Sequence, residues 1–152
     1  MRTNDFQKLL FQSAVSAMAV DGEIHDKEIE EIKSIVKSTA YFLDFEFEKE
    51  LNENINNIKK HGKEAINQYL LLLSSSQLNE NQEVILIEVL LRMMEADNKI
   101  EDNEVKFLHM VKSKLKISAV DLVVKFPKQV DYLMDFSNFG SISSFENDIT
   151  IK

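Results

Sequence analysis

One motif occurs twice in this chain, and its repetition limits the possible folds more than any other feature. The first copy spans residues 21–28 with the sequence DGEIHDKE, and the second spans residues 97–104 with the sequence DNKIEDNE. Each copy follows an apolar run with helical spacing and leads into a second amphipathic run. This arrangement predicts two helix–loop–helix units that repeat each other.

Turn formation and helix capping explain the repeated residues without any ligand. The second residue of each copy, Gly22 or Asn98, tolerates the positive φ that a bend after a helix requires. The isoleucine in the middle of each copy is expected to pack against the core and hold the loop. The last residue, Glu28 or Glu104, falls in the first turn of the next helix, where its carboxylate meets free N–H groups and the positive end of the helix dipole.

A second interpretation of the motif is cation binding. In the calcium loop of EF-hands, glycine is the sixth residue and a bidentate glutamate is the twelfth. In that register Ala17 and Ala19 stand at the first and third ligand positions, and alanine has no ligand atom. In the second copy these positions hold Met93 and Glu95. Binding in the EF-hand manner is therefore not expected of either loop.

A weak divalent-cation site made from both loops is compatible with the sequence. It would form if the two repeats pack about a pseudo-twofold axis. Its ligands would be loop carboxylates, and the second copy, with Glu95, Asp97, Glu101 and Glu104, is the better of the two. This cation is the only cofactor for which the sequence gives any indication. Capping and weak cation binding are thus two hypotheses for one motif.

The composition favours a single all-α domain. The chain has 152 residues, 44% of them hydrophobic, with only 3 glycines and 1 proline. That length can bury a real core, and so few turn-forming residues favour helices over a turn-rich β fold. The formal net charge of −8 argues against a nucleic-acid partner and against adhesion to anionic lipid, because both depend on Lys and Arg.

The sequence shows no sign of secretion or of membrane insertion. It contains no cysteine, which excludes disulfides, zinc–thiolate sites and thiol nucleophiles. The residues that follow Met1 form no apolar signal core. The longest apolar run, residues 84–94, is interrupted by Glu88 and Arg92 and is too short to span a bilayer. We therefore expect a cytoplasmic protein without direct membrane insertion.

Apolar periodicity predicts a compact bundle of about seven helices. The first helix is expected to use Thr3 or Asn4 as its cap, and Asn79 is the expected cap of the fifth. The seventh begins at Ser118 and ends near Phe126, because the proline that follows disfavours helix before it. The ranges expected between the first and the seventh helix are 26–39, 45–60, 63–74, 80–95 and 102–115. Of these, the fifth helix is apolar on nearly all sides and is expected at the centre.

The end of the chain differs in composition, so we divide the chain into a helical domain, residues 1–126, and a C-terminal arm, residues 127–152. The arm is rich in Ser, Asn and Asp and carries four aromatic residues, Tyr132, Phe136, Phe139 and Phe145. Residues 130–136 could extend a helix, and the rest is expected to be irregular. The arm is expected either to pack on the domain or to dock on a partner or on a second copy, which would give a homodimer.

No catalytic constellation is evident in the sequence. The three histidines are His25, at a cap position, His61, at the end of a helix, and His109, expected on the solvent edge of its helix. None is paired with another at helical spacing, and no glycine-rich phosphate loop is present. A divalent-metal-dependent enzyme that uses the first and last carboxylates of each motif copy is the alternative to a non-catalytic protein, although such sites usually add a histidine or a positioned base.

The two motifs resemble the hallmarks of the TerB-like family, which includes the tellurite-resistance protein TerB and the N-terminal domain of a membrane-associated co-chaperone. Residues 17–24 with Glu28 match the first hallmark, and residues 94–100 with Glu104 match the second. The resemblance covers roughly residues 6–115. It implies a compact all-α fold with internal pseudo-symmetry and an acidic surface at the loops that binds a metal ion or a partner.

On matching positions, the resemblance carries over four candidate metal ligands: Asp21, Glu28, Asp97 and Glu104. Together with the missing catalytic constellation and the acidic charge, this resemblance leads us to expect a non-catalytic binding or scaffold module in a bacterial stress-response or membrane-associated complex, whose acidic loops meet a protein partner with a basic surface. Two departures matter, since Asn98 replaces the second glycine and residues 128–152 have no counterpart in the family. Without cysteine, the chain cannot trap tellurite through thiols.

Overall fold

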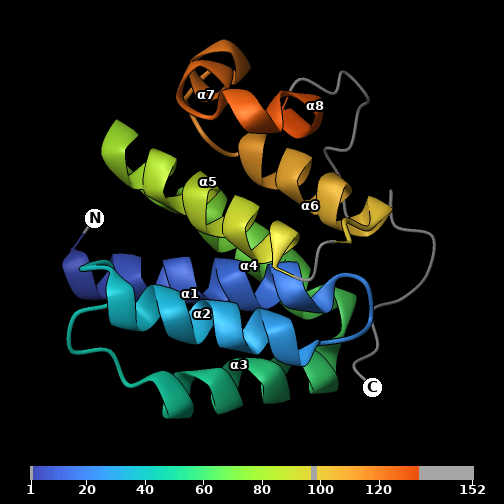
Figure 1. Cartoon of the computed structure of the whole chain (residues 1–152). Coiled ribbons are helices and arrows are strands. Elements are labelled where there is room, and N and C mark those ends of the chain that lie inside the picture. The colour runs from blue at the N-terminus through green and yellow to red at the C-terminus, as the bar shows by residue number, and fades with distance from the viewer. Residues whose placement is uncertain (1, 97–98, 134–152) are drawn as a thin grey trace.

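The computed structural model describes residues 2–96 and 99–133, and every regular element in these ranges is helical (Figure 1). The α-helices are α1 (Thr3–Ala19), α2 (Asp26–Ser38), α3 (Phe47–His61), α4 (Lys63–Ser75), α5 (Glu80–Glu95), α6 (Asp102–Lys112), α7 (Ala119–Lys125) and α8 (Val130–Leu133). The short 3-10 helix η1 (Pro127–Gln129) lies between the last two. The expected all-α bundle is confirmed.

Helix starts follow the expected capping chemistry in α5 and differ from it in α1. The Asn79 side chain accepts a hydrogen bond from Gln82 N (2.8 Å), and the Gln82 side chain accepts one from Asn79 N (3.0 Å). The prediction of a Thr3 or Asn4 cap for α1 is wrong, since the cap residue is Arg2 and no side chain caps the helix. Helix α1 therefore begins with a main-chain hydrogen bond only, which the Arg2 carbonyl accepts from Phe6 N.

The core is built around α1 and α5, which pack against each other through the middle of the molecule (Figure 1). The expected central position of α5 is confirmed by the burial of Leu86, Leu90 and Met94. Helix α1 is also deeply buried over most of its length, with Leu10, Ala14 and Met18 fully buried, although its sequence did not single it out. Ala14 and Ala17 are among its buried residues, and such small side chains let the neighbouring helices approach α1 closely.

The two helix–loop–helix units are present and repeat each other element for element, α1 with α2 and α5 with α6. Helices α1 and α5 finish at the same end of the molecule, so both connecting loops start there (Figure 1). Helices α3 and α4, joined at Gly62 with a φ of 57°, pack against each other and against α1. The two helix–loop–helix units that the repeated motif predicted are therefore present in the fold.

Helix α6 differs from its prediction in two ways. It ends at Lys112 rather than near Leu115, because the chain tightens into turns after that residue. His109 is buried, so its predicted place on the solvent edge is wrong. The reason is that residues 107–111 are all buried, and the helix is therefore covered on more than the one face that its apolar residues indicate.

The C-terminal part of the described chain ends as a short helix. Helix α7 finishes at Lys125, two residues before Pro127, as predicted. The expected helix at residues 130–136 is present as α8 as far as Leu133. The remaining part of the predicted arm, with Phe136, Phe139 and Phe145, lies outside the described residues, so the role of the arm stays a prediction. No helix in the described part of the chain is long and apolar enough to cross a membrane.

Candidate functional site

The first loop, between α1 and α2, is a tight turn closed by its own side chains. Gly22 has a φ of 87°, the positive value expected of it, and its N–H donates to Ala19 O (3.0 Å). Asp21 Oδ1 accepts a hydrogen bond from Glu23 N (3.0 Å), which folds the aspartate over the turn. His25 Nε2 lies 3.7 Å from Asp21 Oδ2 and 3.9 Å from Glu23 Oε2, so one imidazole faces two carboxylates.

Glu28 and Glu104 cap the helices that follow the two loops. Glu28 Oε1 accepts a hydrogen bond from His25 N (3.0 Å), and Glu104 Oε1 accepts one from Glu101 N (3.1 Å). Both glutamates are buried, with relative exposures of 2% and 3%. A carboxylate at this position also faces the positive end of the helix dipole. The capping interpretation of these two residues is therefore confirmed.

The two loops lie against each other at one end of the molecule. Asn103 Nδ2, at the start of α6, donates a hydrogen bond to Val20 O at the end of α1 (3.0 Å). Glu101 of the second loop is close enough to Asp21 of the first for their charges to interact. Lys99 Nζ lies 3.2 Å from Glu101 Oε1 and supplies one positive charge there. The structure thus brings the two repeated motifs together.

Asp21 is a carboxylate whose pKa is shifted at this meeting point. Burial raises the pKa of Asp21 above its ordinary value, and the charges of Glu101 and Glu23 raise it further. The hydrogen bond from Glu23 N and the nearby imidazole of His25 act in the opposite direction. The ionised form of Asp21 is therefore disfavoured, and a positive charge brought to the loops would stabilise it.

The two loops and the first turns that follow them also carry exposed carboxylates. Glu23, Asp26 and Asp102 are exposed and Glu101 is partly exposed, each on a loop or in the first turn of the helix that follows it. We call these four residues and Asp21 the acidic loop face. Their like charges repel one another, and this repulsion lowers the stability of the compact state. The arrangement is suited to receive a cation or a basic side chain.

Three of the four predicted metal ligands, Asp21, Glu28 and Glu104, lie among the described residues. Asp97 lies outside the described residues. Among the described residues, no three His, Cys, Asp or Glu side chains are grouped so that they could hold a metal ion. Ala17 and Ala19 lie inside the buried helix α1, so the EF-hand register is not formed. The four-carboxylate metal site therefore stays a prediction.

Sequence reasoning missed a third buried carboxylate, Glu83 in the first turn of α5. Its two oxygens accept hydrogen bonds from Lys116 N and Ile117 N, both at 3.0 Å. These bonds tie the connection between α6 and α7 to α5, so the role of Glu83 is structural. An acidic residue within the apolar surface of α5 was the available signal, because a buried carboxylate requires hydrogen-bond partners.

Comparison with known protein families gives a match that covers both loops. The family model described as tellurite resistance protein TerB matches residues 9–124, which is more than half of the chain. Comparison with curated proteins and with solved structures gives no significant match. The matched range contains both loops and all helices from α1 to α6 except the start of α1.

Proposed function

Because the chain belongs to the TerB family, we propose that it works as a non-catalytic binding module that presents its acidic loop face to a basic protein partner. The family is in general one of non-enzymatic modules. The observation that carries the proposal is the contact between the two loops through Asn103 and Val20, which brings Asp21 within the range of the charge of Glu101, on loops that also carry exposed carboxylates. We propose a stress-response or membrane-associated complex as its setting.

A basic partner fits this face for an electrostatic reason. The repulsion among its carboxylates is relieved when positive charges approach, so part of the binding free energy comes from removing a strain already present in the free protein. Binding through such a face steers association and fixes orientation more than it adds raw affinity. It also weakens as salt rises, because exposed charges are screened beyond about 8 Å at physiological ionic strength.

Charge reversal tests the proposal. The double variant Asp26→Lys with Asp102→Lys should lose most of the partner captured from the source cell, measured by quantitative mass spectrometry after washes at low and at high salt. The control is Glu30→Lys with Glu53→Lys, which changes the net charge equally at exposed positions outside the acidic loop face. Capture that is equal for both double variants, or that resists high salt, would contradict the proposal.

A weakly bound divalent cation at the same loops is the second candidate. The observation that favours it is again the contact between the two loops, since carboxylates from different loops can share a cation. We expect a dissociation constant on the order of 10⁻⁴–10⁻³ M, as for sites with few charged ligands. Titration calorimetry with calcium, magnesium and manganese measures it.

We do not favour the alternative of a divalent-metal-dependent enzyme. Such an enzyme would need Glu28 and Glu104 as ligands or as bases, and both already accept the main-chain hydrogen bonds that start α2 and α6. Both are also almost fully buried, so a substrate could not reach them without opening the loops. A binding role requires neither the loss of these capping hydrogen bonds nor an opening of the loops.

A further inference from the structure

Helix α7 is apolar on two opposite faces, and the protein covers only one of them. Leu122 is fully buried, and Val123 and Phe126 are partly buried against the core. Val120 and Val124 lie on the opposite face, two residues or about 200° around the helix from Leu122, and are 62% and 74% exposed. A helix that buries only one side usually carries polar residues on the other. The outer face of α7 therefore has an apolar surface left to cover.

The two exposed valines form a stripe at the edge of the molecule. They are four residues apart, so their side chains are neighbours on one face of the helix. Helix α7 lies at the top of Figure 1, on the side of the molecule remote from α3, and its main neighbours are η1 and α8. Valine is a poor helix former, so helix propensity does not explain the pair. Single exposed apolar residues are common, but adjacent ones form a patch, and such patches mark contact surfaces.

Two opposite charges flank the valine stripe on one side. Asp121 and Lys125 each follow one of the two valines in the sequence, and both are exposed. One residue step turns the helix by about 100°, so the two charges form a second row beside the valines. Asp121 lies in the first turn of α7 and Lys125 in the last. The row is therefore self-complementary, because a second copy that runs in the opposite direction places its lysine opposite the aspartate.

We propose that α7 binds the α7 of a second copy of this chain, antiparallel, about a two-fold axis at the level of Leu122. Val120 then packs beside the partner's Val124, and the same contact repeats across the axis. Asp121 faces the partner's Lys125, which gives two ion pairs in each dimer. A uniformly acidic or basic partner would match only one of the two charges, whereas a second copy matches both. With seven residues in α7, the interface is smaller than the roughly 1,200 Å² of a stable one, so the dimer is weak.

The oligomeric state of the full chain tests the apolar part of this contact. Sedimentation equilibrium from about 10 µM to about 1 mM should show a monomer–dimer equilibrium. Val120→Ser with Val124→Ser should weaken dimerisation by about tenfold or more without lowering the melting temperature, since both side chains are exposed in the monomer. The control is Leu43→Ser, which changes a side chain that is 70% exposed elsewhere and should leave the dimer unchanged. A chain that stays monomeric throughout this range, or a dimer that the valine variant does not weaken, would overturn the proposal.

Charge reversal tests the antiparallel pairing itself. Asp121→Lys puts lysines opposite each other across the axis and Lys125→Asp puts aspartates there, so each variant alone should dimerise roughly tenfold more weakly than the natural chain. An equimolar mixture should regain the dimer at low salt, because every facing pair is then opposite in charge. Mixing could not restore an ion pair within one helix or a helix that does not fold. The Asp26→Lys with Asp102→Lys variant should dimerise normally, so this proposal stands or falls independently of the acidic loop face. A mixture that associates no better than the separate variants would refute it.

Discussion

At the scale of single residues, the repeated glutamates show how one side chain can satisfy two interpretations of a motif. Glu28 and Glu104 stand where a metal-binding loop would need its last ligand, and also where a helix needs its capping carboxylate. The structure shows the second role through their hydrogen bonds to His25 N and Glu101 N. A cation would have to share these oxygens with the main chain, which favours weak binding over strong.

Glutamine and alanine substitutions at Glu104 separate capping from cation binding. Glutamine can still complete a capping box, whereas alanine cannot. We expect Glu104→Ala to lower the free energy of unfolding by about 1 kcal/mol, in the range of other capping losses, and Glu104→Gln to lower it less. Combined with Asp97→Asn, the glutamine variant should abolish any calorimetric signal from divalent cations. A cation signal that survives in this double variant would place the ligands elsewhere.

At the scale of helices, the sequence predicted the features that depend on neighbouring residues in the chain and missed those that depend on packing between helices. Most helix boundaries were predicted to within a few residues, because the residues that set them act on their neighbours in the chain. These residues are the caps Asn79 and Glu104, the glycine Gly62 and the proline Pro127. The central place of α1 was not predicted, because the apolar residues of a helix show that it has a buried face but not which other helices will cover it. The loop residues of the site were found, since their motif is local and repeated.

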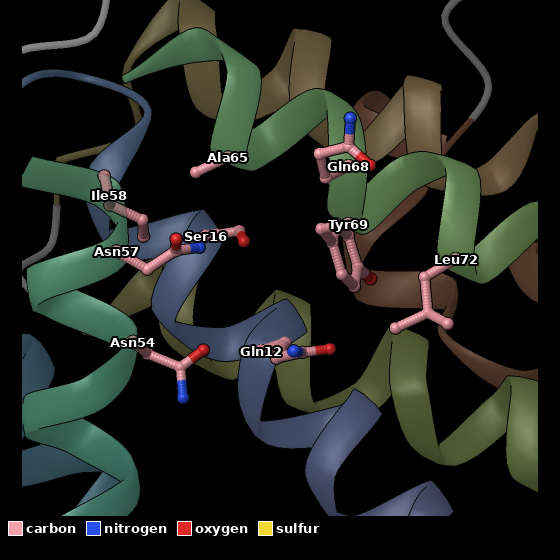
Figure 2. A pocket seen from close by; sticks show the side chains of 9 residues that line it. All are labelled: Gln12, Ser16, Asn54, Asn57, Ile58, Ala65, Gln68, Tyr69 and Leu72. Atoms are coloured by element: carbon pink, nitrogen blue, oxygen red, sulfur yellow. The ribbon is translucent and has the colours of Figure 1, made fainter. Parts of the chain in front are cut away.

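The remaining features of the site arise from packing between helices that are distant in sequence. Glu83 meets the N–H groups of Lys116 and Ile117 only because α5 packs beside the α6–α7 connection. A pocket of about 280 Å³ between α1, α3 and α4 is lined by Gln12 of α1 together with amide side chains of α3 and α4 (Figure 2). Periodicity within one helix does not specify which polar side chains of three helices converge, so neither feature could be read from the sequence.

The contact between α1 and α5 should dominate stability. Leu90 is 1% exposed on α5, whereas Leu43 is 70% exposed in the connection between α2 and α3. Leu90→Ala leaves a cavity in the core and should lower the free energy of unfolding by about 2–5 kcal/mol. Leu43→Ala, the same change at the surface, should alter it by less than about 0.5 kcal/mol. Urea denaturation measures both, and similar losses would mean that the α1–α5 contact is not the centre of the fold.

At the scale of the whole molecule, the acidic loop face adds to an overall excess of negative charge. The chain carries a formal net charge of −8, and the face concentrates part of it at the end where the two repeats meet. Natural proteins commonly accept lower stability at a functional site. Asp21 is the residue at which such a cost can be measured, because its pKa is raised by burial and by neighbouring carboxylates.

The sign of the pH dependence follows from the direction of that shift. When the folded protein binds a proton more readily than the unfolded chain does, ionisation of the group lowers stability as pH rises through the raised pKa. Asp21→Asn removes this ionisation, and its amide oxygen can still accept the hydrogen bond from Glu23 N. The variant should therefore melt at a higher temperature than the natural protein at pH 7, and the difference should shrink as pH falls towards the ordinary aspartate pKa of 3.8.

Asp26→Asn is the matched control for this last prediction. Asp26 belongs to the same face but is exposed in the first turn of α2, where its charge is favourable to the helix dipole. Removing that charge should leave the melting temperature at pH 7 unchanged or slightly lower. Added salt should reduce only the part of the Asp21→Asn gain that comes from Glu101 and Glu23, because burial is not screened. If Asp21→Asn is destabilising at pH 7, the aspartate acts as a structural residue of the turn, and the stored repulsion that favours a basic partner has to be sought at the exposed carboxylates instead.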